Sequence, residues 1–267
     1  MEITISAEIA FRTLIKSNII TFAKTITESD NLDSCFCDNE ININSHNLLF
    51  SVLGNEIKDY IGYLSFFNSS LGNMLENLAM SIASLFYQVS QKVGGTLYYE
   101  QASYIEELIN TYNNRNTPSV NDYNLLRIIK HNNQKIENTQ DCNYYLLDKE
   151  KDAHYLIVFD YELKNKNSSF LKKKLLEQYA ILSNTLSTPA AIYCYFASAY
   201  NRFDEDKEWG QSSVRQFFSE KELLIGKDFW NFVCKSHNGY EIVIDEFRKN
   251  SLYLTQVLDK YLVRYKY

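Results

Sequence analysis

The sequence predicts an α/β fold, in which a mixed sheet is flanked by helices and carries a helical N-terminal subdomain and a helical C-terminal tail. Residues 154–164 (HYLIVFDYELK) alternate like a strand, whereas residues 69–93 repeat leucine and isoleucine at helical spacing. Only two prolines and eight glycines occur in 267 residues, which favours long helices. We expect the helical subdomain over 1–120 and the core with the C-terminal helices over 121–267, joined in one integrated domain.

The N-terminal half is expected to be helical. Ser69 or Ser70 can cap the helix over 69–93, and Gly94-Gly95 can end it. The spacing of apolar residues predicts helices over residues 6–27, 43–57, 69–93, 99–115 and 123–131.

Four elements then follow in the order strand, strand, helix, strand. CNYYLL (142–147) and residues 154–164 predict two strands, which the polar turn DKEKDA (148–153) joins into a hairpin. SFLKKKLLEQYAILSN (169–184) has its leucines near helical spacing, and AAIYCYFASAY (190–200) predicts a buried strand.

The C-terminal part begins with a polar stretch. Residues 201–220 predict a loop with a short strand near Arg215–Phe218. GKDFWNFVCKSH (226–237) predicts a helix, and the apolar positions of residues 239–267 predict a helical tail.

The hairpin sets a register that brings acidic residues together. If the loop is Lys149–Asp152, then Asp148 faces Ala153, and the numbers of paired residues add up to 301. Asp141 then lies opposite Asp160, on the same face of the sheet. A loop with an odd change in length, or a bulge, would reverse that face.

The predicted cluster consists of Asp141, Asp160, Glu162 and Lys164. Carboxylates and a lysine at the end of an apolar strand are costly to place unless they bind something. Carboxylate oxygens are the hard ligands that Mg²⁺ prefers. Lys164 could orient or deprotonate an attacking water, and metal and lysine together would offset the charge that develops on a phosphodiester. The short Glu-x-Lys motif alone also suits a solvated strand face.

These features resemble the Type II restriction endonucleases of the PD-(D/E)xK superfamily, and among them the families that cut interrupted sites of the GGNCC type. The strand–strand–helix–strand order is the core of that fold. The segments that carry the resemblance are SSLGNMLENLAMSIA (69–83), YELK (161–164), KKLLEQYAILSN (173–184), IYCYFASAYNRF (192–203) and LLIGKDFWNFV (223–233).

The resemblance implies roles for particular residues. The second acid and the lysine of the superfamily match Glu162 and Lys164, and the first acid best matches Asp141. Gln140 stands where a proline often precedes that acid, so Asp148, Asp152 and Asp160 remain rival candidates. The glutamate of the preceding helix, which supports the metal site in several families, matches Glu76.

The resemblance further implies cleavage of double-stranded DNA with Mg²⁺ as cofactor and a homodimer as the active form. The net charge is −6, but residues 1–100 hold 5 basic and 11 acidic residues, whereas residues 101–267 hold 22 of each. DNA binding needs a local basic patch rather than a basic protein. The residues expected to contact DNA are Lys172, Lys173, Asn201, Arg202, Lys207 and Arg215; Arg pairs with guanine and Asn with adenine. The run Lys172–Lys174 also suits a solvated helix face.

Composition excludes several classes of protein. Hydrophobic residues at 45% argue against disorder, and no apolar run reaches the ~18 residues that a membrane span needs. The N-terminus lacks the features of a signal peptide, so we expect a cytoplasmic protein. Five scattered cysteines indicate reduced thiols rather than disulfides or a zinc site. Two alternatives stay open: a noncatalytic helical interaction protein, and a PD-(D/E)xK nuclease of repair or mobile-element processing.

Overall fold

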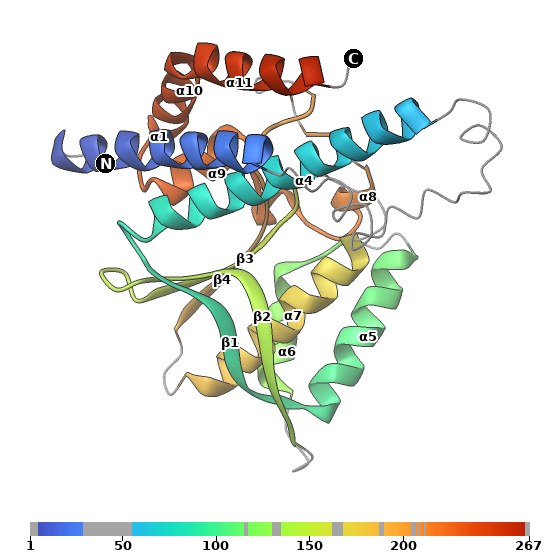
Figure 1. The fold of residues 1–267 in the computed structure, drawn as a ribbon. Coiled ribbons are helices and arrows are strands. Elements are labelled where there is room, and N and C mark those ends of the chain that lie inside the picture. The colour runs from blue at the N-terminus through green and yellow to red at the C-terminus, as the bar shows by residue number, and fades with distance from the viewer. Residues whose placement is uncertain are drawn as a thin grey trace. The chain divides into compact units, whose positions relative to one another are not determined.

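The fold contains a five-stranded mixed sheet with the strand order β1-β2-β3-β4-β5, of which Figure 1 labels β1 to β4. Its strands are β1 (Gln88–Tyr98), β2 (Lys135–Asp148), β3 (Ala153–Phe159), β4 (Ala191–Ser198) and β5 (Leu223–Ile225). β2 is antiparallel to both β1 and β3, whereas β3, β4 and β5 are parallel to one another. The helix α7 (Ser168–Thr185) connects β3 to β4, as a parallel pair requires. This mixed sheet flanked by helices confirms the predicted fold class.

The structure is a computed structural model, and it describes residues 5–28, 55–114, 117–129, 135–161, 168–186, 190–203, 207, 209–210 and 212–264. Within these ranges it describes the backbone alone for residues 55–61, 120, 135–143, 212, 257 and 260–264. The described residues form two compact units, one from Ala79 to Tyr240 and one that combines the residues up to Leu78 with those from Glu241 onward. The C-terminal helices therefore group with the N-terminal helices, whereas the sequence suggested that they group with the sheet.

The β2–β3 hairpin has the predicted register. Asp148 pairs with Ala153 and Tyr144 with Ile157, so the numbers of each pair add up to 301. The four-residue loop closes because Asp152 adopts a left-handed conformation with φ of 49°, which short polar residues tolerate better than most. The Asp148 carboxylate also accepts a hydrogen bond from the Glu150 backbone N–H, at 3.1 Å.

Helices cover both faces of the sheet. One face packs against α5 (Tyr99–Asn113), α6 (Val120–Ile128) and α7, around a core that includes Leu156 and Val158 of β3. On the other face, Tyr155 and Phe159 of β3 contact Phe232 and Phe229 of α9 (Lys227–Val233). All seven residues of β3 are buried as a result. The two cysteines of this unit whose side chains the structure describes, Cys194 and Cys234, are buried free thiols.

Residues 88–93 were expected to continue a helix, and this prediction was wrong. The helix α4 (Asn55–Ala83) ends earlier, and the chain enters β1 at Gln88. Pairing of β1 with β2 along the whole strand outweighs the helical spacing of its apolar residues. The two glycines lie inside β1, and Gly95 has φ of 153°. A Cβ there would come within 2.3 Å of Thr185 Oγ1, so the glycine allows α7 to pack closely on the strand.

The segment after β4 also differs from the prediction. Residues near Arg215–Phe218 form the short helix α8 (Ser212–Arg215) and a turn, and the strand comes later, as β5. Val214, Phe217 and Phe218 are all buried. Their spacing of three and four residues suits a helical turn, because a strand would point neighbouring side chains to opposite faces. The 3₁₀ helix η1 (Glu220–Glu222) then leads into β5.

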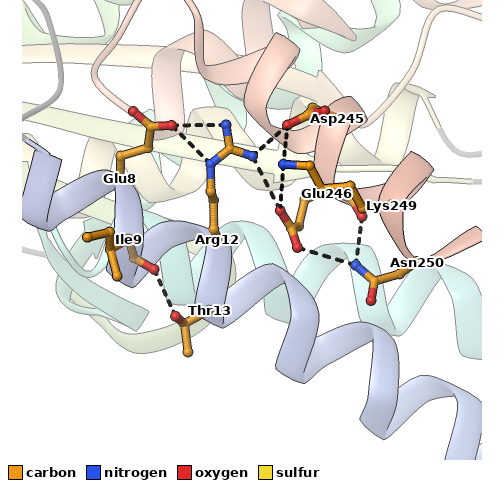
Figure 2. A network of polar contacts seen from close by, with 8 residues as sticks. All are labelled: Glu8, Ile9, Arg12, Thr13, Asp245, Glu246, Lys249 and Asn250. Atoms are coloured by element: carbon orange, nitrogen blue, oxygen red, sulfur yellow. Dashed lines mark hydrogen bonds and ion pairs between the residues drawn. The ribbon is translucent and has the colours of Figure 1, made fainter.

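The second unit is helical and contains α1 (Ile5–Glu28), most of α4, α10 (Gly239–Lys249) from Glu241 onward, and α11 (Ser251–Arg264). Phe22, Ile26, Tyr63 and Met74 form one buried apolar cluster in it. Arg12 of α1 joins the two ends of the chain (Figure 2). Its guanidinium lies 2.9 Å from Glu8, 2.7 Å from Asp245 and 3.3 Å from Glu246.

Candidate active site at the carboxyl ends of the parallel strands

The carboxyl ends of β3, β4 and β5 lie side by side. The Asp160 N–H donates to the Ala197 carbonyl at 3.0 Å, which continues the parallel ladder one residue past β3. Ser198 pairs with Ile225, and the Gly226 N–H donates to the Ser198 carbonyl at 2.9 Å. Asp160, Ser198 and Ile225 therefore form one row across three strands, and the outer backbones lie about 10 Å apart. In open α/β sheets, ligands bind at such carboxyl ends.

Asp160 extends the side of β3 that carries Leu156 and Val158. Successive side chains of a strand alternate between the faces, so Asp160 belongs to the face covered by α7. Its side chain is partly buried. The next residue, Tyr161, contacts Tyr200 with ring centroids 5.7 Å apart, which ties the chain after β3 to the chain after β4.

Asp141 lies next to an irregularity in β2. Its backbone pairs with Lys92, whereas Tyr145 pairs with Ser90, so β2 uses four residues where β1 uses two. Bulges of this kind re-aim side chains and are frequent beside active sites. The described pairing of β2 with β3 ends at Tyr144, before Asp141 is reached. The predicted pairing of Asp141 with Asp160 therefore stays a prediction, as does the direction of the Asp141 side chain.

Two rival candidates for the first acid lie far from this edge. Asp148 and Asp152 flank the hairpin turn at the opposite end of β3, roughly 20 Å from Asp160 along the seven-residue strand. Asp148 is buried and pairs with Lys235 at 3.0 Å. Burial alone would raise the pKa of Asp148, but Lys235 and the backbone N–H groups of Glu150 and Lys151 together lower it. For a site at this edge, Asp141 and Asp160 are therefore the remaining candidates for the first acid.

The described part of the chain does not test the other predicted catalytic residues. Glu162 and Lys164 lie outside the described residues. Glu76 is partly buried in α4 and belongs to the helical unit. Among the described side chains, no three His, Cys, Asp or Glu residues are close enough to share a metal ion; the side chains of Asp141 and Glu162 are not part of that set. The roles of these residues stay predictions.

Three of the residues predicted to read bases line one hollow of about 350 Å³ beside β5. Asn201 and Lys207 come from the loop after β4, and Arg215 ends α8. Arg202 is exposed but does not line this hollow; its guanidinium lies 5.9 Å from the Phe203 ring. The remaining lining residues are Trp209, Glu220, Leu223, Ile225, Lys227 and Asp228. Single-sequence reasoning missed them, although LLIGKDFW (223–230) was among the segments that carried the resemblance.

The loop after β4 is organised by Asn201. Its Nδ2 donates to the Lys207 carbonyl at 2.7 Å, and its Oδ1 accepts from the Phe203 N–H at 3.0 Å. These bonds hold the amide within its own loop. The side chain therefore shapes the hollow.

The structure corrects the expectation that Lys172 contacts DNA. Its side chain is fully buried, with Nζ 2.5 Å from Glu222 Oε1 and 3.0 Å from the Tyr123 hydroxyl. Tyr123 in turn donates to Glu222 at 2.5 Å. Burial, reinforced by the nearby carboxylate, raises the pKa of Tyr123 well above its ordinary value, so the phenol stays a neutral donor. Lys173 remains at the surface and pairs with Glu106 of α5.

The fold and this edge define an α/β protein of the restriction-endonuclease class. The chain matches the model of the family described as "Type II restriction endonuclease, HinfI" over residues 8–251. Because this match covers most of the chain, the protein belongs to that family. It is a site-specific deoxyribonuclease, and its substrate is DNA. The searches of curated proteins and of solved structures found no match. In the ranges that the structure describes, every helix is too short or too polar to cross a bilayer.

Proposed function

We propose that the protein is a Mg²⁺-dependent Type II endonuclease of a restriction–modification system, with an active site of the PD-(D/E)xK type. The main structural support for this proposal is the row formed by Asp160, Ser198 and Ile225. It sets the Asp160 carboxylate, which the sequence Tyr-Glu-Leu-Lys follows directly, about 10 Å from the hollow of charged side chains beside β5. A site-specific nuclease needs both parts, because one side must hold the scissile phosphate while the other reads the bases.

The residues would divide the work as follows. Asp141 and Glu162, together with Asp160, would hold a divalent cation, since carboxylate oxygens are the donors that Mg²⁺ prefers. When bound, the cation offsets the negative charge that develops on the phosphodiester. Lys164 positions or deprotonates the attacking water, whose oxygen adds to the phosphorus opposite the leaving oxygen. The P–O bond to the leaving oxygen breaks, and that oxygen takes up a proton from a water molecule. Glu76 would support the site from α4.

The recognition of DNA and the assembly follow from the same proposal. Arg202, Lys207, Arg215 and Lys173 would contact the duplex, with Asn201 shaping the loop that presents the first two. A homodimer supplies one active site to each strand of a site with two-fold symmetry. The interrupted GGNCC-type site stays a prediction, as does action in the cytoplasm.

A plasmid digest tests this function. The purified protein should cut plasmid DNA into discrete bands with Mg²⁺ and leave it intact with EDTA. Sequencing of the fragment ends then gives the recognition site and the overhang. A smear instead of bands would indicate a general nuclease. Intact plasmid under every condition, with no preferred duplex in binding assays, would contradict the proposal.

A further inference from the structure

The hollow beside β5 carries charges of both signs. Lys207, Arg215 and Lys227 contribute cations, and Glu220 and Asp228 contribute carboxylates. A site that binds only phosphate groups is not expected to contain carboxylates, because carboxylates repel the DNA backbone. Carboxylates are useful where the ligand presents amino groups, as cytosine and adenine do in the major groove. The mixture of charges therefore points to the edges of bases.

Arg215 and Glu220 form an ion pair within this hollow. The Arg215 side chain is 35% exposed and the Glu220 side chain 76% exposed, so both groups are accessible from solvent. Together they present hydrogen-bond donors and acceptors side by side. The guanidinium also offsets the repulsion that a lone carboxylate would meet near DNA.

The backbones on both sides of this pair are anchored in the core. Val214 precedes Arg215 and is buried, and Phe217 and Phe218 follow. Glu222, two residues after Glu220, accepts hydrogen bonds from the Ser219 N–H and hydroxyl at 2.9 and 2.8 Å. The same carboxylate holds buried Lys172. The exposed pair therefore sits on a segment whose position is fixed from inside, as a reader of base edges requires.

We propose that Arg215 and Glu220 jointly read one guanine·cytosine base pair through the major groove. Arg215 donates to N7 and O6 of the guanine, and Glu220 accepts from N4 of the cytosine. These atoms lie next to one another on the groove edge of the same base pair. The assignment rests on the proposed function, and it names the base pair that this part of the site selects.

The test uses duplexes that carry the cleavage site and every single base-pair substitution of it. Binding is measured in the Glu162→Ala background so that the duplexes stay intact. Arg215→Ala should reduce the preference for the G·C pair by roughly 5- to 150-fold, the range that one bidentate base contact supplies. Glu220→Ala, which removes the acceptor for cytosine N4, should reduce the preference for the same pair by a smaller factor. Binding to random duplex should change by less than about threefold.

Lys221→Ala is the matched control, because Lys221 is exposed on the same segment but does not line this hollow. It should leave the preference at every position unchanged. Thermal unfolding of each variant checks that the fold is intact. Replacement of the guanine by 7-deazaguanine, which lacks N7, should weaken binding of the parent protein more than that of Arg215→Ala.

The outcomes separate this proposal from the one on which it rests. If the unmodified protein cuts plasmid into discrete bands but both variants keep full discrimination, the G·C assignment is wrong and the proposed function stands. The G·C assignment would also be overturned if the two variants lost their base preference at different positions of the site, or if the preference were lost at an A·T pair. Equal weakening of binding to all duplexes would overturn it as well. If the unmodified protein cuts nothing and prefers no duplex, both proposals fail.

Discussion

Lys172 and Glu222 form an ion pair inside the protein core, with Lys172 Nζ 2.5 Å from Glu222 Oε1. The ammonium group lies over the rings of Tyr123 and Phe218, 4.9 and 5.2 Å from their centroids. α7 and η1 are thereby joined through the core. Lys172 therefore contributes to the core, although it belongs to a run of three lysines that suits a solvated surface.

Removal of one partner from this pair should destabilise the protein strongly. Lys172→Met should lower the free energy of unfolding by about 3–5 kcal/mol, because it leaves the Glu222 carboxylate buried without its cation. Urea unfolding measures the change. The double variant Lys172→Met/Glu222→Gln should lose less than the sum of the two single losses.

Lys174→Met is the control for this experiment, since Lys174 is only partly buried in the same helix. It should change the stability by less than about 0.5 kcal/mol. Equal effects at positions 172 and 174 would contradict the buried ion pair.

Gly95 should not tolerate a side chain. Gly95→Ala would force a Cβ to within 2.3 Å of Thr185 Oγ1 and 3.0 Å of Ile181 Cγ2, at φ of 153°. We expect a loss of about 1–3 kcal/mol of stability, measured by thermal or urea unfolding. Thr185→Ala in the same chain should recover part of the loss by removing the closest contact.

Gly210 provides the matched glycine control. A Cβ at this position would meet nothing within 4 Å. Gly210→Ala should therefore leave stability within about 0.5 kcal/mol of the unmodified protein. A loss at Gly210 as large as that at Gly95 would show that the contact with α7 is not the cause.

The Asp148–Lys235 pair should make stability depend on pH. The pKa of Asp148 is lowered below its ordinary value of 3.8 in the folded state, because Lys235 and backbone N–H groups outweigh the effect of burial. A lowered carboxyl pKa contributes stability above its unfolded value and loses it as the pH falls through the folded value. Asp148→Asn should cost about 2–3 kcal/mol at pH 7.

The difference in stability between the parent protein and Asp148→Asn should stay constant between pH 5 and 9 and shrink below the ordinary pKa of 3.8. The pKa of Lys235 is raised above 10.5: burial opposes this rise, but Glu150 and Asp148 outweigh it. The Asp148–Lys235 ion pair should therefore still be present at the alkaline end of the range from pH 5 to 9. A difference that grows as the pH falls would have the wrong sign for this pair.

The catalytic residues should separate cleavage from binding. Glu162→Ala, Lys164→Ala and Asp141→Asn should each lower cleavage by roughly 1,000-fold, because each removes several kcal/mol of transition-state stabilisation. Specific DNA binding should remain largely intact, as measured by gel shift without added metal. Asp152→Asn, at the hairpin turn far from Asp160, should cleave normally. Retained cleavage in Glu162→Ala would refute the assigned site.

The sequence alone was sufficient for features with local signals. The polar turn 149–152 between two apolar strands set the register of β2 and β3. Periodic apolar residues predicted α1, α5, α7 and β4 close to their observed bounds. The order of these elements, together with YELK and with LLIGKDFW after the core, carried the resemblance that indicated the class of enzyme. Turn length, side-chain period and motif order are properties of neighbouring residues, so one chain reveals them.

Only the tertiary structure decided what depends on distant partners. Residues 88–93 suit a helix, yet they form β1 because β2 is available for pairing. The sequence predicts a surface position for Lys172, but the residue pairs in the core with Glu222, which lies fifty residues later in the chain. The hollow beside β5 combines side chains from a loop, two short helices, a strand and the start of α9. Burial and pairing between distant segments are properties of the folded chain, because they depend on which surfaces meet and not on local order.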